Sequence, residues 1–466
     1  MTARDGRNTD TGTGQDRRIQ ILANEKPYKA VLKMGLPVAF GMLFMVAYNL
    51  VDTYFIGMLH DDFQLAAANL AYPVLMVMIA VSGIVGNGGA SYIARCMGAG
   101  MQEEADRTLV LGFEMILGMS LLLTLAGVFA LDPIVKVLGA REETFLYTKE
   151  YTGVLLIGSF FTMGNYAFGQ LLRSEGSVMY ATISMIAGCV ANIILDPIFI
   201  FTFGMEIRGA AIATVIGNVL STMICLWVYA AGKSLLGLSP KYIGFSLRIF
   251  REIMLVGIPH TLEQFLSTAS ILVLNNLAAS YGGLYVAAMG ISSKIMSFGN
   301  YLYQGIAAGC QPLMGYNYGA GNYRRMRELI RAAVIITTGI ELCVMTVYGI
   351  TAPVLAGLFS ENETVITIAA VTLRSFMLIL PFVGTTSIVR NVYNAIGMPM
   401  YAFTITIVRQ LVLYIPFLLI LNRLFAYNGL IHAQPAEEIL CAVFSVFLLE
   451  RSLHRMDEKR EKTGKL

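Results

Sequence analysis

Long apolar stretches without charged residues recur along the whole chain. Several reach or exceed the roughly 20 residues that a helix needs to cross the apolar core of a bilayer, among them 63–94, 176–195, 209–232, 264–293 and 295–323. Unpaired backbone groups are not tolerated in hydrocarbon, so these stretches must be helical. The pattern predicts an all-α membrane protein with twelve transmembrane helices, near residues 31–56, 65–94, 108–131, 147–172, 177–203, 209–232, 253–280, 285–313, 329–352, 365–389, 399–421 and 430–450.

Composition agrees with this pattern, and the distribution of charge orients the helices. Only 14% of the 466 residues are charged and the mean hydropathy is +0.66, whereas soluble chains carry about 25% charged residues. Of the 33 Lys and Arg residues, 25 fall in segments on one side of the predicted membrane and 5 in segments on the other. Because basic residues favour the cytoplasmic side, we expect a multi-pass cell-membrane (inner-membrane) protein with both termini in the cytoplasm.

The polar segments divide the chain into domains. Residues 1–28 lack the apolar core of a signal peptide and are expected to form a disordered cytoplasmic tail. We expect an N-terminal six-helix lobe at 29–232, a cytoplasmic inter-lobe linker at 233–252, a C-terminal six-helix lobe at 253–450, and a basic cytoplasmic tail at 451–466. The six cysteines and four histidines are scattered singly, which suggests no zinc or haem site.

The two halves repeat each other's glycines and prolines at an offset of about 221 residues. The matching positions are Gly35-Leu36-Pro37 with Gly257-Ile258-Pro259, Gly88 with Gly309, Gly98-Ala99-Gly100 with Gly319-Ala320-Gly321, Asp132-Pro133 with Ala352-Pro353, and Gly176 with Gly397. Because six is an even number of helices, both lobes have the same orientation and should be related by a pseudo-twofold axis along the membrane normal. Such lobes can rock against each other and expose the space between them to either side in turn.

Two acidic residues interrupt apolar helices of the first half. Asp52 ends a charge-free run and has Tyr48 one turn earlier, and Asp196 has Asn192 one turn earlier, so each pair shares a helix face. Pro197 removes a backbone donor and should loosen the helix beside Asp196. An acidic side chain in the apolar core of the membrane costs free energy, so we expect it to be paired with another group or to have a functional role. The two acids could bind Na⁺ with hard oxygen ligands, could carry a proton, or could lie at the headgroup level and cap loops.

The repeat and these motifs resemble the multidrug and toxic compound extrusion (MATE) family over residues 28–450. The resemblance rests on 48–52 (YNLVD) leading to Gly57, on 192–197 (NIILDP), and on the Gly-Ala-Gly segments followed by charged residues. It implies a cation site in the N-terminal lobe formed by Asp52, Asn192, Asp196 and Thr214, which would be a metal site if the ion is Na⁺. It also implies that Pro37 has a conformational role and that Tyr48 borders the cation pocket.

The C-terminal half departs from branches of the family that carry acids in helices seven, eight and ten. Its predicted helix eight has Lys294, and helix ten has Arg374 but no acid. Glu437 and Glu438 fall near the repeat counterpart of Thr214 and could line the central space or lie at the membrane edge. Methionine and aromatic side chains suit promiscuous binding of organic cations. The candidate substrate-binding residues are Tyr48, Met45, Glu263 and Met296.

These observations predict a multidrug efflux antiporter that exports amphiphilic cations in exchange for H⁺ or Na⁺ by alternating access. We expect a monomer with small organic substrates in a lipid bilayer, no cofactor and no nucleic-acid partner. A flippase for lipid-linked oligosaccharides or other lipids is the alternative, since it can share two such lobes, and Lys294, Arg374 and Arg409 would suit its pyrophosphate. An enzyme is not expected, because no metal set, activated nucleophile or phosphate loop is visible.

Overall fold

The computed structural model describes residues 12–59 and 61–463, and within these ranges every regular element is a helix. The N-terminal lobe contains α2 (Pro27–Gly57), α3 (Asp62–Gly98), α4 (Gln102–Phe129), α5 (Leu131–Val137), α6 (Glu142–Ile157), α7 (Ser159–Ser174), α8 (Val178–Pro197), η1 (Ile198–Thr202) and α9 (Glu206–Ala230). The C-terminal lobe contains α10 (Leu247–Ala279), α11 (Gly283–Gly319), α12 (Tyr323–Gly357), α13 (Glu363–Phe376), η3 (Met377–Ile379), α14 (Leu380–Ala395), α15 (Pro399–Ile407), η4 (Val408–Tyr414) and α16 (Ile415–Thr463). The predicted all-α fold is confirmed.

Several of these elements combine into single membrane crossings. Among the described residues, eight helical stretches are long and apolar enough to span a bilayer, and the last of them covers Pro399–Glu458. This last stretch contains a reversal at Ala426, whose φ of 51° lies in the left-handed region, so it holds two crossings. Helices α10, α11 and the pair α6–α7 supply the remaining crossings, which gives the twelve-span fold.

The duplication is visible in the contacts between the lobes. A Cβ atom on Gly98 would lie 1.9 Å from the carbonyl oxygen of Tyr316, and a Cβ on its repeat counterpart Gly319 would lie 2.1 Å from the carbonyl oxygen of Arg95. Arg95 and Tyr316 are themselves counterparts at the same offset, so the two contacts are copies of each other. These glycines are therefore required because helices α3 and α11 meet backbone to backbone.

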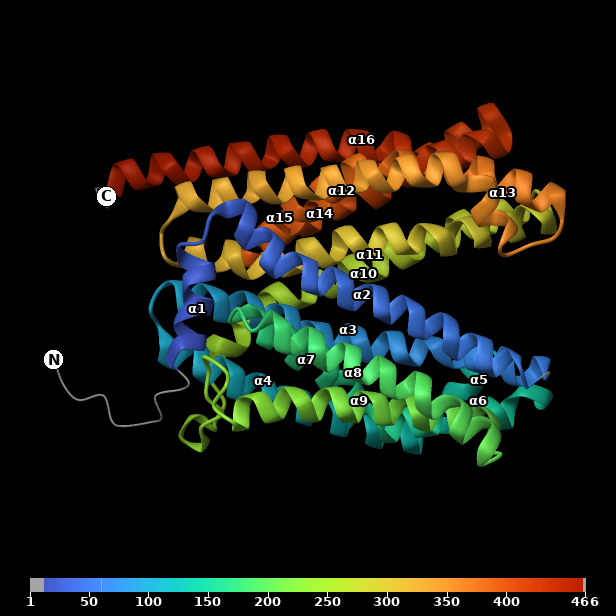
Figure 1. Cartoon of the computed structure of the whole chain (residues 1–466), viewed down its shortest axis with the longest axis horizontal. Coiled ribbons are helices and arrows are strands. Elements are labelled where there is room, and N and C mark those ends of the chain that lie inside the picture. The colour runs from blue at the N-terminus through green and yellow to red at the C-terminus, as the bar shows by residue number, and fades with distance from the viewer. Residues whose placement is uncertain (1–11, 60, 464–466) are drawn as a thin grey trace.

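The two lobes lie side by side, with α2 and α3 facing α10 and α11 across the interface (Figure 1). The first half of the chain fills one side of the molecule and the second half fills the other. Helix α1 (Gly12–Ala23) and the C-terminal end of α16 lie at the same end of the molecule (Figure 1). An even number of crossings requires this placement.

Helix α1 bridges the two lobes at that end. The guanidinium of Arg18 donates hydrogen bonds of 2.7 Å to the Ser177 hydroxyl and to the carbonyl oxygen of Lys233, both on the N-terminal side. The amide of Asn317 in α11 donates to the carbonyl oxygen of Leu22, whose side chain is fully buried. Helix α1 thus contacts both lobes at this end of the molecule.

The prediction of a disordered tail is wrong over Gly12–Ala23, which forms α1, while residues 1–11 lie outside the described residues. The segment is polar overall and does not have the length of a stable isolated helix. Its buried Leu22 and its hydrogen bonds to both lobes stabilise it instead. A helix whose stability comes from docking carries little signal in its own sequence.

Candidate functional site

The carboxyl groups of Asp52 and Asp196 meet inside the N-terminal lobe. Asp52 comes from α2 and Asp196 from the last turn of α8, and their side chains lie within hydrogen-bonding range of each other. Asp196 is fully buried and Asp52 is partly buried. Two carboxylates this close repel each other strongly in a buried setting. The pair therefore calls for a proton or a metal cation between the two acids.

Asn192 and Thr214 complete the polar cluster. The Asn192 amide nitrogen is 3.3 Å from Asp196 Oδ1 and 3.2 Å from Thr214 Oγ1, and it donates to both. Asn192 is 2% exposed and Thr214 is 8% exposed, so these bonds lie away from bulk solvent. The structure thus brings together all four residues that the sequence proposes for a cation site. They come from three helices, α2, α8 and α9.

The local sequence explains how α8 presents its acid. Asn192 and Asp196 are one helical turn apart and so share a face. Pro197 lacks the backbone N–H that would continue the α-helical ladder, and the chain passes at once into the π-helical turn η1. The regular α-helix therefore ends beside Asp196, at the position where the sequence predicts that Pro197 loosens it. Single π-helical turns are frequent at functional sites because they redirect side chains and free carbonyl groups.

Three buried oxygens of the cluster lack a donor within the part of the chain that the structure describes, apart from any proton shared between the two acids. They are Asp52 Oδ1, Asn192 Oδ1 and Asp196 Oδ2. Buried acceptors without partners are rare in folded proteins and point to a bound species. Carboxylate and amide oxygens are hard ligands that suit an alkali cation. A proton held between the two acids would satisfy part of the same set.

Two tyrosines border the acids. Tyr48 lies one turn before Asp52 on α2, in electrostatic range of both acids, as its predicted place in the pocket requires. Tyr151 on α6 is 4% exposed and lies in electrostatic range of both acids and close to Thr214. Sequence reasoning missed Tyr151, because it directly follows Lys149 and Glu150 in the polar part of α6. Nothing in the local sequence distinguishes it from the other tyrosines of the chain.

The remaining predicted site residues lie apart from this cluster. Met45 is half-buried on α2, one turn before Tyr48. Met296 is 3% exposed and packs in the core of the C-terminal lobe, so it does not line an open surface. Pro37 lies on α2 between Gly35 and Ala39, two positions at which α2 contacts α11 closely. Pro37 therefore lies in the segment of α2 that packs on α11, on the side of the helix turned away from that contact, and about four turns from Asp52.

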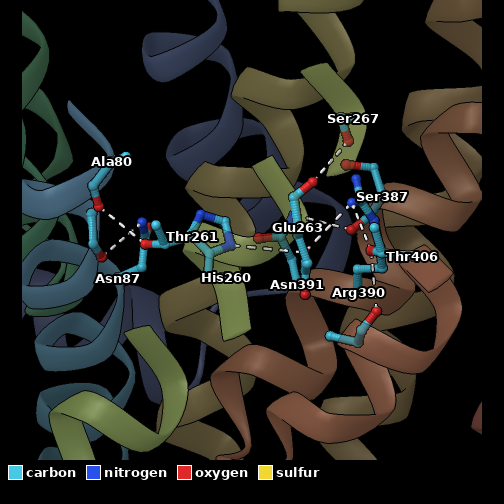
Figure 2. Close-up of polar contacts among 12 residues, drawn as sticks. Ala80, Asn87, His260, Thr261, Glu263, Ser267, Ser387, Arg390, Asn391 and Thr406 are labelled. Atoms are coloured by element: carbon cyan, nitrogen blue, oxygen red, sulfur yellow. Dashed lines mark hydrogen bonds and ion pairs between the residues drawn. The ribbon is translucent and has the colours of Figure 1, made fainter. Parts of the chain in front are cut away.

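Glu263 forms a separate polar group in the C-terminal lobe (Figure 2). Its Oε2 is 3.5 Å from Arg390 Nη1 and 3.9 Å from His260 Nδ1, and the residue is 4% exposed. Figure 2 shows Glu263 pointing from α10 towards Arg390 of α14, while Thr261 on the same helix donates to the carbonyl oxygen of Ala80 in the N-terminal lobe. The charge of Glu263 is thus compensated within its own lobe.

A second ion-paired group lies deeper in the same lobe. Arg409 is 2.6 Å from Glu438 Oε2 and 3.5 Å from Glu437 Oε1, and both acids are almost fully buried. The membrane-edge placement considered for these two acids does not hold, because they face the lobe interior. Lys294 and Arg374, in contrast, are exposed. Of the three basic residues proposed for a pyrophosphate, only Arg409 therefore lies inside the lobe, and it is paired with acids.

Comparisons with known proteins agree with this architecture. A family model described as MatE matches residues 37–198 and again 259–420, one match in each lobe. The chain is 29% identical to the multidrug export protein MepA of Staphylococcus saprophyticus over 437 residues, 93% of this chain and 96% of that protein. It is 30% identical over 439 residues to MepA of Staphylococcus aureus strain MRSA252, with the same shares covered. A solved structure described as the outward-facing conformation of a multidrug resistance MATE family transporter of the MOP superfamily superimposes with a TM-score of 0.91 and 27% identity, over 95% of this chain and 99% of that one.

Proposed function

Because the chain belongs to the MATE family of multidrug efflux transporters, we propose that it exports amphiphilic organic cations in exchange for H⁺ or Na⁺. The facing carboxyl groups of Asp52 and Asp196 are the observation that carries this proposal. They lie in apolar helices, where an uncompensated charge costs about 2.5–3.5 kcal/mol by insertion scales. A site retained at this cost is expected to bind an ion as part of the transport cycle.

Ion binding at this site would change the charge of the N-terminal lobe. With both acids ionised the cluster carries two negative charges, and a bound proton or Na⁺ removes one of them. The change favours whichever lobe arrangement best accommodates the reduced charge, because a ligand shifts an equilibrium by its differential affinity for the two states. An inward ion gradient could in this way drive the outward movement of a substrate.

Pro37 is placed to transmit this change. It lies on the same helix as Asp52 and next to the contacts that Gly35 and Ala39 make with α11. A proline within a helix permits bending because one backbone hydrogen bond is missing. We expect α2 to bend at Pro37 when the acids bind or release their ion, which would loosen or tighten the lobe interface.

The distribution of basic residues favours export of cations over the flipping of a lipid-linked pyrophosphate. A pyrophosphate needs several cationic groups in one place. Here Lys294 and Arg374 are exposed, and Arg409 is bonded to Glu437 and Glu438. Labelling of lipid intermediates in a deletion strain tests the alternative, since accumulation of an untranslocated lipid would favour the flippase.

The orientation of the chain follows from charge. We propose that α1 and the end of α16 face the cytoplasm, on the strength of 25 basic residues in the segments of that side against 5 on the other. The shared placement of α1 and the C-terminal end of α16 supports this (Figure 1). A reporter that works only in the cytoplasm should be active when it is fused after residue 463, and a reporter that works only outside should be inactive there.

The central test uses Asp52→Asn and Asp196→Asn in vesicles with proton and sodium gradients imposed separately. We expect both variants to reach the membrane at the parent's level and to lose gradient-driven export of a cationic dye. The matched control is Asp132→Asn, which changes an exposed aspartate paired with Lys149 and should export like the parent. Normal export by both variants would overturn the proposal, and the gradient that drives the parent identifies the ion.

A further inference from the structure

The interior of the C-terminal lobe holds more acids than bases. Its buried carboxyl groups belong to Glu263, Glu341, Glu437 and Glu438, all at most 4% exposed. The guanidinium groups paired with them are those of Arg390 and Arg409. If these four acids and two bases were ionised and His260 beside Glu263 were neutral, the interior would carry an excess of two negative charges. Buried charges are normally paired one to one, so this excess needs an explanation.

Glu341 is the acid without a base. It lies in the middle of α12 and is fully buried, and neither of its carboxyl oxygens has a hydrogen-bond partner among the described residues. Thr337, one turn earlier on the same helix face, is also fully buried, and its hydroxyl oxygen likewise lacks a partner there. Both side chains lie against Gly384 of α14, where a Cβ would approach Thr337 Cγ2 to 2.5 Å and Glu341 Cγ to 3.9 Å. Glu341 is thus enclosed by tightly packed helices.

The titratable groups around Glu341 are tyrosines. Tyr303 of α11 and Tyr348 of α12 both lie in its electrostatic range. Tyr303 is also in range of Arg409, Glu438 and Arg390, so it lies between Glu341 and the ion-paired groups. Within the described chain, Glu341 forms no ion pair with a side chain of α2, α11, α13 or α14. One carboxyl and one hydroxyl supply too few oxygens for a metal cation, whereas a proton needs only the carboxyl.

Arg409 forms ion pairs with two acids, Glu437 and Glu438. It belongs to the π-helical segment η4, and its guanidinium faces Glu438 at 2.6 Å and Glu437 at 3.5 Å. Glu437 Oε2 and Glu438 Oε1 have no hydrogen-bond partner in the described part of the chain. One guanidinium compensates one carboxylate, and a second carboxylate beside the first is destabilised by repulsion. The three side chains are best satisfied when the two acids share one proton.

These groups have no equivalent in the other lobe. At the repeat offset, Glu341 corresponds to Ser120, whose hydroxyl donates a hydrogen bond to the carbonyl oxygen of Leu117. Arg409 and Glu438 correspond to Gly188 and Gly217, two glycines that allow α8 and α9 to touch. The C-terminal lobe therefore carries charged groups at positions where the N-terminal lobe is neutral and closely packed.

We propose that the C-terminal lobe contains a proton-binding site of its own, in which Glu341 holds one proton and the Glu437–Glu438 pair over Arg409 holds another. Each site is a carboxyl oxygen that gains a proton when the surrounding solution supplies it and returns it as an aqueous proton. The site is separate from Asp52 and Asp196, so the proposal does not depend on the function proposed above for those two acids. It would allow each lobe to exchange protons during transport.

Infrared spectroscopy of the purified transporter in lipid nanodiscs tests whether the acids are protonated. The parent at neutral pH should show the carbonyl stretch of protonated carboxyl groups. We expect Glu341→Gln to remove one component of this absorption and Glu437→Gln to remove another, while the exposed control Glu361→Gln removes none. Asp52→Asn with Asp196→Asn should leave both components in place. An unchanged spectrum in Glu341→Gln and Glu437→Gln would show ionised acids and overturn the proposal.

A second measurement asks whether these protons exchange. A cationic dye is added to weakly buffered transporter that already carries Asp52→Asn and Asp196→Asn, and proton release is followed with an impermeant pH indicator. We expect release to persist in this background and to be lost when Glu341→Gln and Glu437→Gln are added. If the background variant binds dye and releases no protons, the exchange part of the proposal is wrong. Loss of export in the background variant affects only the N-terminal site, so the two proposals fail separately.

Discussion

The two lobes share a fold but differ in where they place charge. The N-terminal lobe gathers Asp52, Asn192, Asp196 and Thr214 around one point between α2, α8 and α9. At the repeat offset the C-terminal lobe has apolar residues instead, namely Val273, Leu413, Phe417 and Pro435. Its own charges lie elsewhere, at Glu341 and around Arg409. Duplication thus preserved the backbone contacts between lobes while the buried polar groups diverged.

This difference shows what each part of the molecule has to conserve. The reciprocal contacts of Gly98 and Gly319 leave no room for a side chain, so both copies retain glycine. A buried polar group has no such requirement at the counterpart position, provided that its partners change with it. The glycines at the interface between the lobes are therefore the same in both repeats, whereas the buried polar groups inside each lobe differ.

The largest effect is expected when a polar residue of the N-terminal site is replaced by the apolar residue at the matching position of the C-terminal lobe. Asn192→Leu, which copies the side chain of Leu413, removes the amide that bonds Asp196 and Thr214. We expect export of a cationic dye to fall to the level of vesicles without transporter, with a loss of about 1–3 kcal/mol in stability from the unsatisfied groups. Leu413→Asn is the reciprocal control and should retain most export. Full activity of Asn192→Leu would remove Asn192 from the site.

Removing the shared base of the other lobe should mainly affect stability. Arg409→Met leaves Glu437 and Glu438 buried without their partner, and loss of one member of a buried ion pair costs about 3–5 kcal/mol. We expect a clear drop in the thermal unfolding temperature in detergent. Adding Glu437→Gln and Glu438→Gln to Arg409→Met should restore most of it. A variant as stable as the parent would mean that Arg409 does not compensate these acids.

The glycine contacts provide a test of the symmetry itself. Gly98→Ala and Gly319→Ala each place a methyl group against a backbone carbonyl at 1.9 and 2.1 Å, which forces the lobes apart. Overpacking of this kind costs about 1–3 kcal/mol, and the two variants should lose similar amounts of stability and export. Gly118→Ala, at a position with open space, is the control. Markedly unequal effects would show that the two contacts are not equivalent.

The smallest expected effect concerns α1, which has no counterpart in the repeat. Arg18→Ala removes hydrogen bonds to Ser177 and to the Lys233 carbonyl, at a cost of about 1–2 kcal/mol. We expect the end of the molecule that carries α1 to open more often, seen as faster labelling of a cysteine placed at Ala308 on α11. Arg17→Ala, on the exposed side of α1, should label like the parent. Equal labelling of Arg18→Ala would show that α1 does not hold the lobes together.

Much of the candidate site could be predicted, and the reason lies in its chemistry. Acids are so unfavourable in apolar helices that Asp52 and Asp196 stand out in the sequence, and the helical turn places Asn192 and Tyr48 beside them. Tyr151 could not be found in this way, because it joins the site only through the packing of α6 on α9. Glu437 and Glu438 were visible as acids, but their shared contact with Arg409 depends on how η4 and α16 face each other.

The sequence by itself determined the membrane helices and the duplication, and it predicts the orientation of the helices in the membrane. These properties depend on the length of apolar runs, on the sidedness of Lys and Arg, and on glycines and prolines that recur in order, all of which are local quantities. The tertiary structure alone decided that α1 docks on both lobes and which buried charges are compensated. Such contacts join residues from separate helices, and the energy of a buried charge depends on the groups that surround it in space.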